Sequence, residues 1–358
     1  MKYSIVSFTV FLFLFSCNSD FKPRTFTKIE IQPVFEDSTL SVRALDYDED
    51  YLYYGSADHI GKRALKNENK LDLTKLEYKS GKNHFKHIMT YENAPLHFRA
   101  IEQVSGHFFA ISIANPARLY KLSRKATEPK LVYSEVHENV FYDSMAFWND
   151  REGIAIGDVI NGCMSVIITR DGGESWVKLS CDVLPQSQEG EGAFAASDTN
   201  IAINGDKTWV ATTAGRILYS EDKGRTWAVF ETPIMKEKET EGIYSIDFYN
   251  SEIGYGIGGD YTKPADSSAN KIRTLDGGKT WDLVSENKSP GYRSCVQFIP
   301  NRQGMELVAV GFKGVDYSND GGDTWTHLSD EGFYTIRFIN ETEAYAAGHG
   351  RISKLVFK

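Results

Sequence analysis

Short apolar runs separated by small and polar turn residues dominate the chain after its first 25 residues, and no long stretch there has helical periodicity. Residues 26–32 alternate apolar and polar side chains, as a half-buried strand does, whereas residues 307–311 form a continuous apolar run. This pattern predicts many short β-strands joined by tight turns, and therefore an all-β fold.

One phrase occurs four times in the second half of the chain: a Ser or Thr, an Asp two residues later, a Gly, another Ser or Thr, and a Trp. Its aspartates and tryptophans are Asp171 and Trp176, Asp222 and Trp227, Asp276 and Trp281, and Asp320 and Trp325. Each copy lies between two apolar runs, which predicts the turn of a β-hairpin. Short polar side chains bond nearby backbone amides in such turns, glycine accepts positive φ, and the tryptophan buries apolar surface.

We interpret these residues as structural, because turn chemistry explains them without a role as metal ligands or acid–base groups. The aspartates are 51, 54 and 44 residues apart, a spacing typical of four-stranded blades around an axis. Seven similar units are expected, and they open at residues 42–45, 98–101, 142–147, 192–196, 244–248, 292–298 and 334–338.

The last unit ends after its third strand, so we expect residues 26–32 to supply the missing strand. Such closure removes exposed sheet edges. The fold class predicted is a seven-bladed β-propeller with hairpins at the four aspartate phrases, in a single domain covering residues 26–358, because repeats that bury their faces against neighbours form one unit.

The N-terminus predicts export. Lys2 precedes an apolar run over residues 5–15, and Ser16 stands before Cys17. We expect a signal peptide over residues 1–16, lipid attachment at Cys17 and a tether over residues 17–25, with an uncleaved anchor as the alternative. The protein would then reside in the bacterial cell envelope, outside the cytoplasm, in the periplasm or on the cell surface.

Cysteine placement fits such a compartment. Cys163 and Cys181 lie nearly symmetrically about the predicted turn at Gly172 and Gly173, so they are candidates for a disulfide. Spacing does not establish the bond, and the alternative is two free thiols.

Composition disfavours several partners. The net charge is -9, and Lys and Arg residues are scattered rather than gathered in a stripe, which argues against nucleic-acid binding. A glycine pattern at residues 254–259 falls on a predicted blade strand rather than between a strand and a helix, and no paired-histidine zinc helix occurs. We therefore expect a monomer with no cofactor and no metal.

One set of charged residues is a candidate binding site. In the first strand of four units, the residue after the opening aromatic or apolar position is Arg43, Arg99, Asp143 or Arg293. The innermost strands of a propeller face its axis, so the three guanidiniums are expected to converge at one mouth and bind a carboxylate, a phosphate or an acidic protein segment. Alternatively, each arginine pairs locally with Asp46, Glu102, Asp143 or a backbone carbonyl and only fills the centre.

The repeated phrase resembles the Asp-box, named for bacterial neuraminidases, in which it forms a structural hairpin away from the active face. The longer unit, an aromatic-Arg-Ser/Ala-apolar strand, a Gly-rich strand and the box, resembles the propeller family of photosystem II assembly and stability factors from about Val42 to Phe357. That resemblance implies seven blades and an arginine-rich surface that receives a membrane-protein client. Arg43, Arg99 and Arg293 match the arginine position, whereas Asp143 and Ser245 depart from it.

The function expected is therefore that of a noncatalytic, membrane-tethered propeller that binds a protein client or an anionic or saccharide ligand at its channel mouth. The competing class is a secreted sialidase-like enzyme or other glycoside hydrolase. The Arg-Ile-Pro motif typical of sialidases is missing, and the sequence does not single out two suitably spaced carboxylates among 49 acidic residues.

Overall fold

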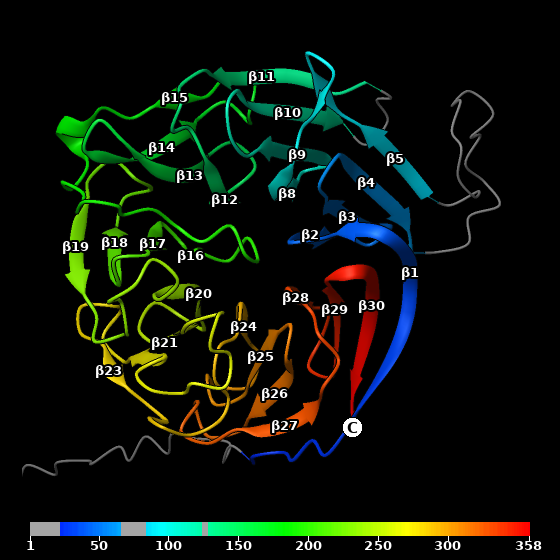
Figure 1. The fold of residues 1–358 in the computed structure, drawn as a ribbon, viewed down its shortest axis with the longest axis vertical. Coiled ribbons are helices and arrows are strands. Elements are labelled where there is room, and N and C mark those ends of the chain that lie inside the picture. The colour runs from blue at the N-terminus through cyan, green and yellow to red at the C-terminus, as the bar shows by residue number, and fades with distance from the viewer. Residues whose placement is uncertain (1–21, 66–83, 124–127) are drawn as a thin grey trace, which may run out of the picture.

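Seven four-stranded antiparallel sheets surround a central axis in the computed structural model, which describes residues 22–65, 84–123 and 128–358 (Figure 1). In blades 1 to 6 the strands follow chain order from the axis outward. The predicted seven-bladed β-propeller is confirmed. The expected signal peptide and Cys17 lie outside the described residues.

The first three blades are built from residues of the N-terminal half. Blade 1 contains β2 (Ala44–Tyr47), β3 (Tyr51–Gly55), β4 (His59–Ala64) and β5 (His84–Ile88). Blade 2 contains β8 (Phe98–Val104), β9 (His107–Ser112), β10 (Ala117–Ser123) and β11 (Lys130–Glu135), and a small β6 (Thr90–Tyr91) and β7 (Ala94–Pro95) ribbon precedes it. Blade 3 contains β12 (Tyr142–Phe147), β13 (Gly153–Ile160), β14 (Cys163–Thr169) and β15 (Val177–Lys178).

Blades 4 to 6 repeat the same order. Blade 4 contains β16 (Ile201–Asn204), β17 (Lys207–Ala211), β18 (Arg216–Ser220) and β19 (Ala228–Glu231). Blade 5 contains β20 (Ile243–Phe248), β21 (Gly254–Gly258), β22 (Lys271–Thr274) and β23 (Asp282–Leu283). Blade 6 contains β24 (Cys295–Phe298), β25 (Leu307–Gly311), β26 (Gly314–Ser318) and β27 (Thr326–Ser329).

Blade 7 joins the two ends of the chain. Its strands are β28 (Thr335–Phe338), β29 (Glu343–Ala347), β30 (His349–Phe357) and, outermost, β1 (Ile29–Ser41). Strand β1 pairs antiparallel with β30 from Ile29 opposite Phe357 to Ser41 opposite His349, and Figure 1 shows the two side by side. The predicted closure by an N-terminal strand is confirmed, but this strand begins at Ile29 and continues well beyond residue 32.

The four repeated hairpin turns are held by hydrogen bonds to their aspartates. In the turn of blade 4, Asp222 accepts the backbone N–H of Thr226 at 2.8 Å and its hydroxyl at 2.6 Å, while the Ser220 hydroxyl donates at 2.9 Å. Burial alone would raise the pKa of Asp222, but these hydrogen bonds outweigh it and hold the pKa at about 2. The aspartate is thus a saturated acceptor within its own turn.

The tryptophans that follow the turns pack between neighbouring blades. Trp176 is buried with Phe109 of blade 2 and Phe147 of blade 3, its ring centre 5.7 Å from that of Phe147. Turn glycines permit this close packing: a Cβ at Gly322, where φ is +89°, would lie 2.1 Å from the Tyr255 ring of the preceding blade. The same turns therefore reverse the chain and lock adjacent sheets together.

Helix contributes little to the part of the chain that the structure describes, which has one short 3₁₀ helix at Cys181–Val183. Across residues 22–65, 84–123 and 128–358, no helix is both long and apolar enough to span a bilayer.

Blade 4 begins later than the sequence predicts. Residues 192–196 are not a strand; the innermost strand is β16, which starts at Ile201. The preceding residues 192–200, here named the plug segment, reach inward to the axis of the ring, as the green chain before β16 in Figure 1 shows. The prediction of a strand at residues 192–196 is therefore wrong. Side chains of neighbouring blades hold this segment instead of a sheet: the Ala193 N–H donates to Asp158 at 3.1 Å, and the Phe194 ring stacks with its centre 3.7 Å from that of Tyr244.

Candidate functional site

The plug segment forms hydrogen bonds with the inner parts of blades 2, 3, 5, 6 and 7. Asp198, 6% exposed, accepts the backbone N–H groups of Ile101 in blade 2 at 2.9 Å and of Met145 in blade 3 at 3.1 Å. The Thr199 carbonyl accepts from the Ile246 N–H of blade 5 at 2.9 Å. These bonds satisfy backbone groups in the middle of inner strands, so the segment is an integral part of the centre.

Blades 6 and 7 complete this attachment. The Ser197 hydroxyl donates to the Ser294 carbonyl at 2.6 Å, and the Thr335 hydroxyl donates to the Ser197 carbonyl at 2.9 Å. Arg337 donates to the Asp198 carbonyl at 3.1 Å. A buried polar segment held by this many partners is a rigid element of the site.

Two faces of the propeller can be defined from the strand directions. The arginine face is the side where the inner strands begin, next to Arg43 and Arg99. The turn face is the opposite side, which carries the turns between first and second strands and the four hairpin turns of Asp171, Asp222, Asp276 and Asp320.

Arg43 and Arg99 lie together at the arginine face beside the plug segment. Arg43 Nη1 lies 3.5 Å from the Ala196 carbonyl oxygen, and Arg99 Nη1 lies 3.5 Å from that of Ala195. Both contacts are longer than an ordinary N–H···O bond, and the Arg43 guanidinium also stacks 4.3 Å over the Tyr334 ring. Within the described residues neither guanidinium has an ion pair with a carboxylate.

The charges around this pair leave it cationic. Burial, followed by repulsion from Arg43, lowers the pKa of Arg99, while Asp143 acts in the opposite direction. Asp143 is fully buried and both its carboxyl oxygens lack a hydrogen-bond partner. Burial and the neighbouring Asp158 raise the pKa of Asp143 well above its usual range against the effect of Arg99, so its neutral form is favoured and neutralises little of the arginine charge.

Arg293 is not part of this pair. It is 4% exposed and binds Asp316 of the same blade, with Nε and Nη2 each 2.6 Å from Oδ2. Strand pairing explains the difference: Cys295 stands opposite Val310 as Ala44 stands opposite Gly55, so the residue equivalent to Arg43 is Ser294. A shift of one residue along a strand moves the side chain to the other face. The expectation that Arg293 converges with Arg43 and Arg99 is corrected accordingly.

A second set of charged residues lies near the ends of the inner strands. Asp46 accepts the Gln103 N–H of the next blade at 2.7 Å, and Asp247 accepts the Phe298 N–H of its next blade at 2.7 Å. Burial raises the pKa of both aspartates to about 6, partly offset by these hydrogen bonds and by Arg337. Equivalent positions in blades 1 and 5 thus bridge the inner strand of each blade to that of the next.

Glu102 and Arg337 occupy the same position in blades 2 and 7. Burial, together with Asp46 and Asp198, raises the pKa of Glu102 well above its usual range, and Arg337 opposes this. Sequence reasoning gave Arg337 no role, although a signal was present: Asp46, Glu102, Asp247 and Arg337 recur at one position of the repeated first strand.

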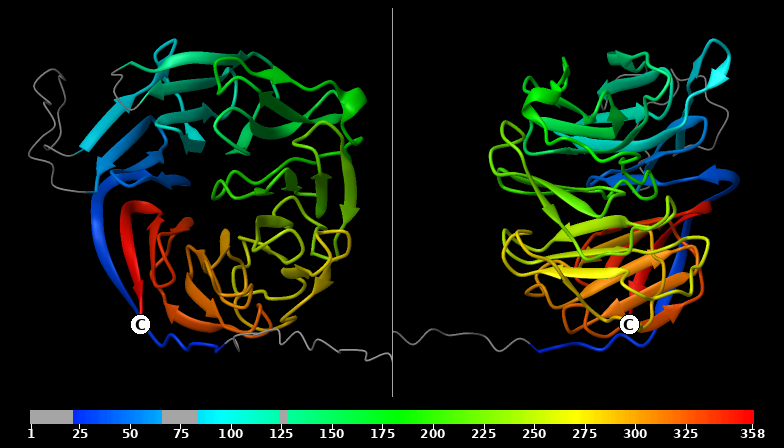
Figure 2. Two further views of the ribbon diagram at one scale, coloured as in Figure 1. Left: turned by 180° about the vertical axis from the view of Figure 1, so that it is seen from behind. Right: turned by 60° about the vertical axis from the view of Figure 1, so that its left-hand side comes forward.

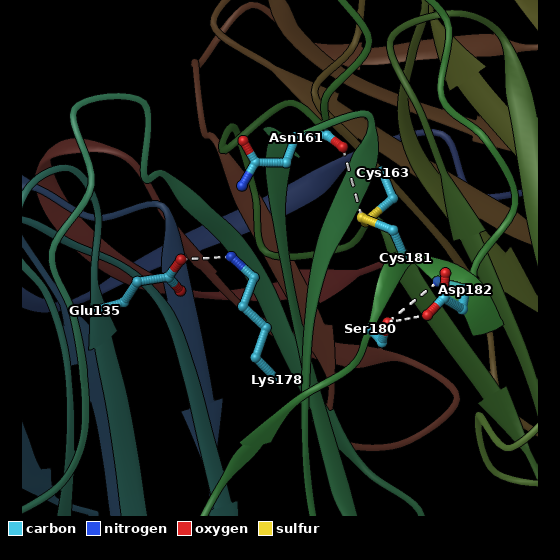
Figure 3. Close-up of a disulfide and its surroundings, with 7 residues drawn as sticks. All are labelled: Glu135, Asn161, Cys163, Lys178, Ser180, Cys181 and Asp182. Carbon is cyan, nitrogen blue, oxygen red and sulfur yellow. Dashed lines mark hydrogen bonds and ion pairs between the residues drawn. A yellow bond between two sulfur atoms is a disulfide. The ribbon is translucent and has the colours of Figure 1, made fainter.

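The structure joins Cys163 and Cys181 in a disulfide, with Cα atoms 5.5 Å apart (Figure 3). The bond connects the start of β14 to the 3₁₀ helix after β15, and the Glu135–Lys178 ion pair lies nearby between blades 2 and 3. The remaining described cysteine, Cys295, is buried and unpaired. The disulfide thus ties the third strand of blade 3 to the segment that follows its fourth strand.

No group of three or more His, Cys, Asp or Glu side chains suited to hold a metal ion occurs in residues 22–65, 84–123 and 128–358. The carboxylate of the blade 4 hairpin turn, Asp222, and those of Asp46, Asp198 and Asp247 are instead engaged by backbone N–H or hydroxyl groups.

Solved structures of similar fold support the propeller architecture of this chain. No protein-family model matches the chain, and no curated protein matches it in sequence. Among solved structures, "YCF48 bound to D1 peptide" is similar with a TM-score of 0.62 and 12% identity over 95% of this chain and 96% of that one. "Crystal structure of RRP9 WD40 repeats" is similar with a TM-score of 0.59 and 12% identity over 94% of this chain and 100% of that one. Both likenesses extend over nearly the whole molecule and support the β-propeller architecture.

Proposed function

We propose that this protein is a noncatalytic, lipid-anchored propeller of the bacterial cell envelope that binds an acidic segment of a protein client at its arginine face. Arg43 and Arg99 are the residues that receive the client's carboxylates. Asp143 flanks them without cancelling their charge, and Cys17 carries the lipid.

The observation that carries the proposal is the pair of guanidiniums without carboxylate partners. Like charges held close together on a rigid scaffold repel each other, and an incoming anion relieves that repulsion. Each guanidinium has several N–H donors but only one long contact to a plug carbonyl, so donors remain for a bidentate carboxylate. A protein with net charge -9 that keeps two such cations together has a preferred place for anions.

The structural neighbours support a protein partner. The solved complex of YCF48 with D1 peptide has a propeller of the same overall architecture with a peptide bound. Propellers commonly present loops around the axis as binding surfaces, and function depends on those loops rather than on the fold.

The hydrolase alternative receives no specific support. A glycosidase needs two carboxyl groups that reach the scissile bond. Asp46, Asp198 and Asp247 have raised pKa values, as catalytic acids do, but each accepts backbone N–H bonds that hold neighbouring inner strands together. Such carboxylates stabilise the ring, so we do not propose hydrolysis.

The test compares two double variants with the same change in charge. Arg43→Gln/Arg99→Gln removes the proposed site, whereas Arg151→Gln/Arg225→Gln removes two exposed arginines on the turn face. Each protein is titrated with a fluorescent oligoglutamate peptide, followed by anisotropy, and is used for crosslinking capture from detergent-solubilised envelopes.

We expect the arginine-face variant to bind the peptide at least roughly tenfold more weakly than wild type, because each charge-assisted hydrogen bond contributes about 1.5–3 kcal/mol. The same variant should lose the captured client that the turn-face variant retains. Equal binding and equal capture by the two folded variants would refute the arginine pair as the site.

A further inference from the structure

The first described residues form a strap, residues 22–28, that is fixed to blades 6 and 7. Arg24 Nη2 lies 2.5 Å from Oε2 of Glu306, whose side chain is wholly buried, and also donates to the Glu341 carbonyl at 3.1 Å. The Arg24 carbonyl in turn accepts from Asn319 Nδ2 at 2.6 Å. Breaking this attachment would leave the buried Glu306 carboxylate with fewer partners, so the strap is held firmly.

Apolar packing and main-chain bonds extend the attachment on both sides of Arg24. The Phe26 ring is buried with its centre 4.8 Å from that of Tyr317, and Thr27 N–H donates to the Lys358 carbonyl at 2.9 Å. At the other end, Arg302 Nη2 donates to the Lys22 carbonyl at 2.9 Å. The chain is thus positioned from Lys22 onward.

All of these partners lie at or near the turn face. Arg302 and Glu306 belong to the turn between β24 and β25, Glu341 to the turn between β28 and β29, and Asn319 to the hairpin turn of blade 6. The views in Figure 2 show this N-terminal segment, in blue, along the rim of the ring. The chain therefore leaves the propeller at the turn face of blades 6 and 7.

Strand β1 fixes the distance from this exit to the arginine face. It starts at Ile29 beside the strap and ends at Ser41, two residues before Arg43, so it crosses the full depth of the ring. Its register shifts place these thirteen residues opposite only the nine residues of β30, His349–Phe357, and nine residues at about 3.3 Å each make this depth about 30 Å. By contrast, the five residues from Cys17 to Lys22 reach at most about 17 Å when extended.

From this mismatch in length we propose that the lipid surface is the partner of the turn face at blades 6 and 7, and that Arg43 and Arg99 open away from the membrane. The inference rests on the proposed lipid anchor at Cys17. A leash of about 17 Å cannot bring a face about 30 Å from the exit into contact with the bilayer. The site consequently accepts a segment that projects from the membrane or belongs to a soluble protein.

The experiment places one fluorophore on each face of the same blade. The full-length lipidated protein is reconstituted into phosphatidylcholine vesicles containing a lipid with a nitroxide on its headgroup. Asp323→Cys labels the turn face of blade 6, and Lys313→Cys labels its arginine face; both positions are exposed. The disulfide and the buried Cys295 leave the introduced thiol as the reactive one in the described chain.

We expect strong quenching of the label at position 323, and quenching at position 313 no greater than that of a Cys17→Ala protein mixed with the same vesicles. Two results in protein that sediments with the vesicles would overturn the orientation while leaving the anchor intact. One is equal quenching at positions 313 and 323, and the other is no quenching at either position. If full-length protein prepared from membranes fails to sediment with vesicles, the proposed anchor is wrong and the orientation fails with it. Peptide binding by Arg43 and Arg99 is measured separately in solution. It therefore distinguishes a failure of the anchor or of the orientation from a failure of the binding site.

Discussion

Replacing Asp198 tests whether the plug segment stabilises the propeller from its centre. Its two carboxyl oxygens accept one buried backbone N–H each, from Ile101 and Met145. Asp198→Asn keeps one oxygen and tolerates the left-handed backbone at φ +58°, so it leaves one N–H unsatisfied. A buried unsatisfied donor costs about 1–3 kcal/mol, and this is the expected loss in free energy of unfolding.

Asp198→Ala should cost more than the Asn variant. It removes both acceptors and places a Cβ-bearing residue without a polar side chain in the left-handed region, which adds about 1–2 kcal/mol. The expected total is therefore roughly 3 kcal/mol or more. The matched control is Asp206→Asn, whose side chain is 67% exposed and 3.4 Å from Lys223, and it should change stability by less than about 0.5 kcal/mol.

Urea unfolding at neutral pH, followed by tryptophan fluorescence, measures these differences from midpoint shifts at constant slope. The reasoning is refuted if both Asp198 variants match the Asp206 control. It is also refuted if the alanine variant is at least as stable as the asparagine variant, because the number of lost acceptors would then not decide the cost.

Two further predictions concern protons and close packing. Burial raises the pKa of Asp198 to about 7, against an ordinary value of about 3.9, so the folded protein retains a proton that the unfolded chain has released. This stabilisation is complete below the unfolded pKa and is lost as pH rises through about 7; chemical denaturation should therefore give lower stability at about pH 8.5 than at about pH 6.5, with a smaller decrease in Asp198→Asn. An equal decrease in that variant would contradict the assignment. Gly322→Ala should lower the thermal midpoint clearly more than Gly205→Ala, because the added Cβ would lie 2.1 Å from the Tyr255 ring. Gly205 is the matched control, since it also has positive φ but a Cβ there would have no atom within 4 Å. Equal shifts of the two midpoints in differential scanning calorimetry would count against the packing argument.

The blade count and ring closure could be predicted because their signals are local. A hairpin turn needs its Asp, Gly and hydroxyl residues within one short phrase, and four copies of that phrase are visible by inspection. The pairing of β1 with β30 followed from the missing strand of the last unit. These features depend on residue type and spacing alone.

The centre of the ring could not be predicted in the same way. Residues 192–196 have the small apolar composition of an inner strand, and only contacts with blades far away in sequence make them a plug. The prediction that Arg293 joins Arg43 and Arg99 was wrong for a different reason. Tyr292-Arg293-Ser294 has the same residue pattern as Phe98-Arg99-Ala100, yet the strand register differs by one residue. Sequence pattern does not fix register where two alignments fit equally well.

The plug segment adds a second connection between the blades, at the centre of the ring. If the ring were closed only by the pairing of β1 with β30, separation of those two strands would open it within blade 7. Here residues 192–200 form hydrogen bonds with blades 2, 3, 5, 6 and 7, including blade 7 itself through Thr335 and Arg337. Separation of β1 from β30 at the outer edge of blade 7 can therefore occur without loss of the arrangement of the inner strands around the axis.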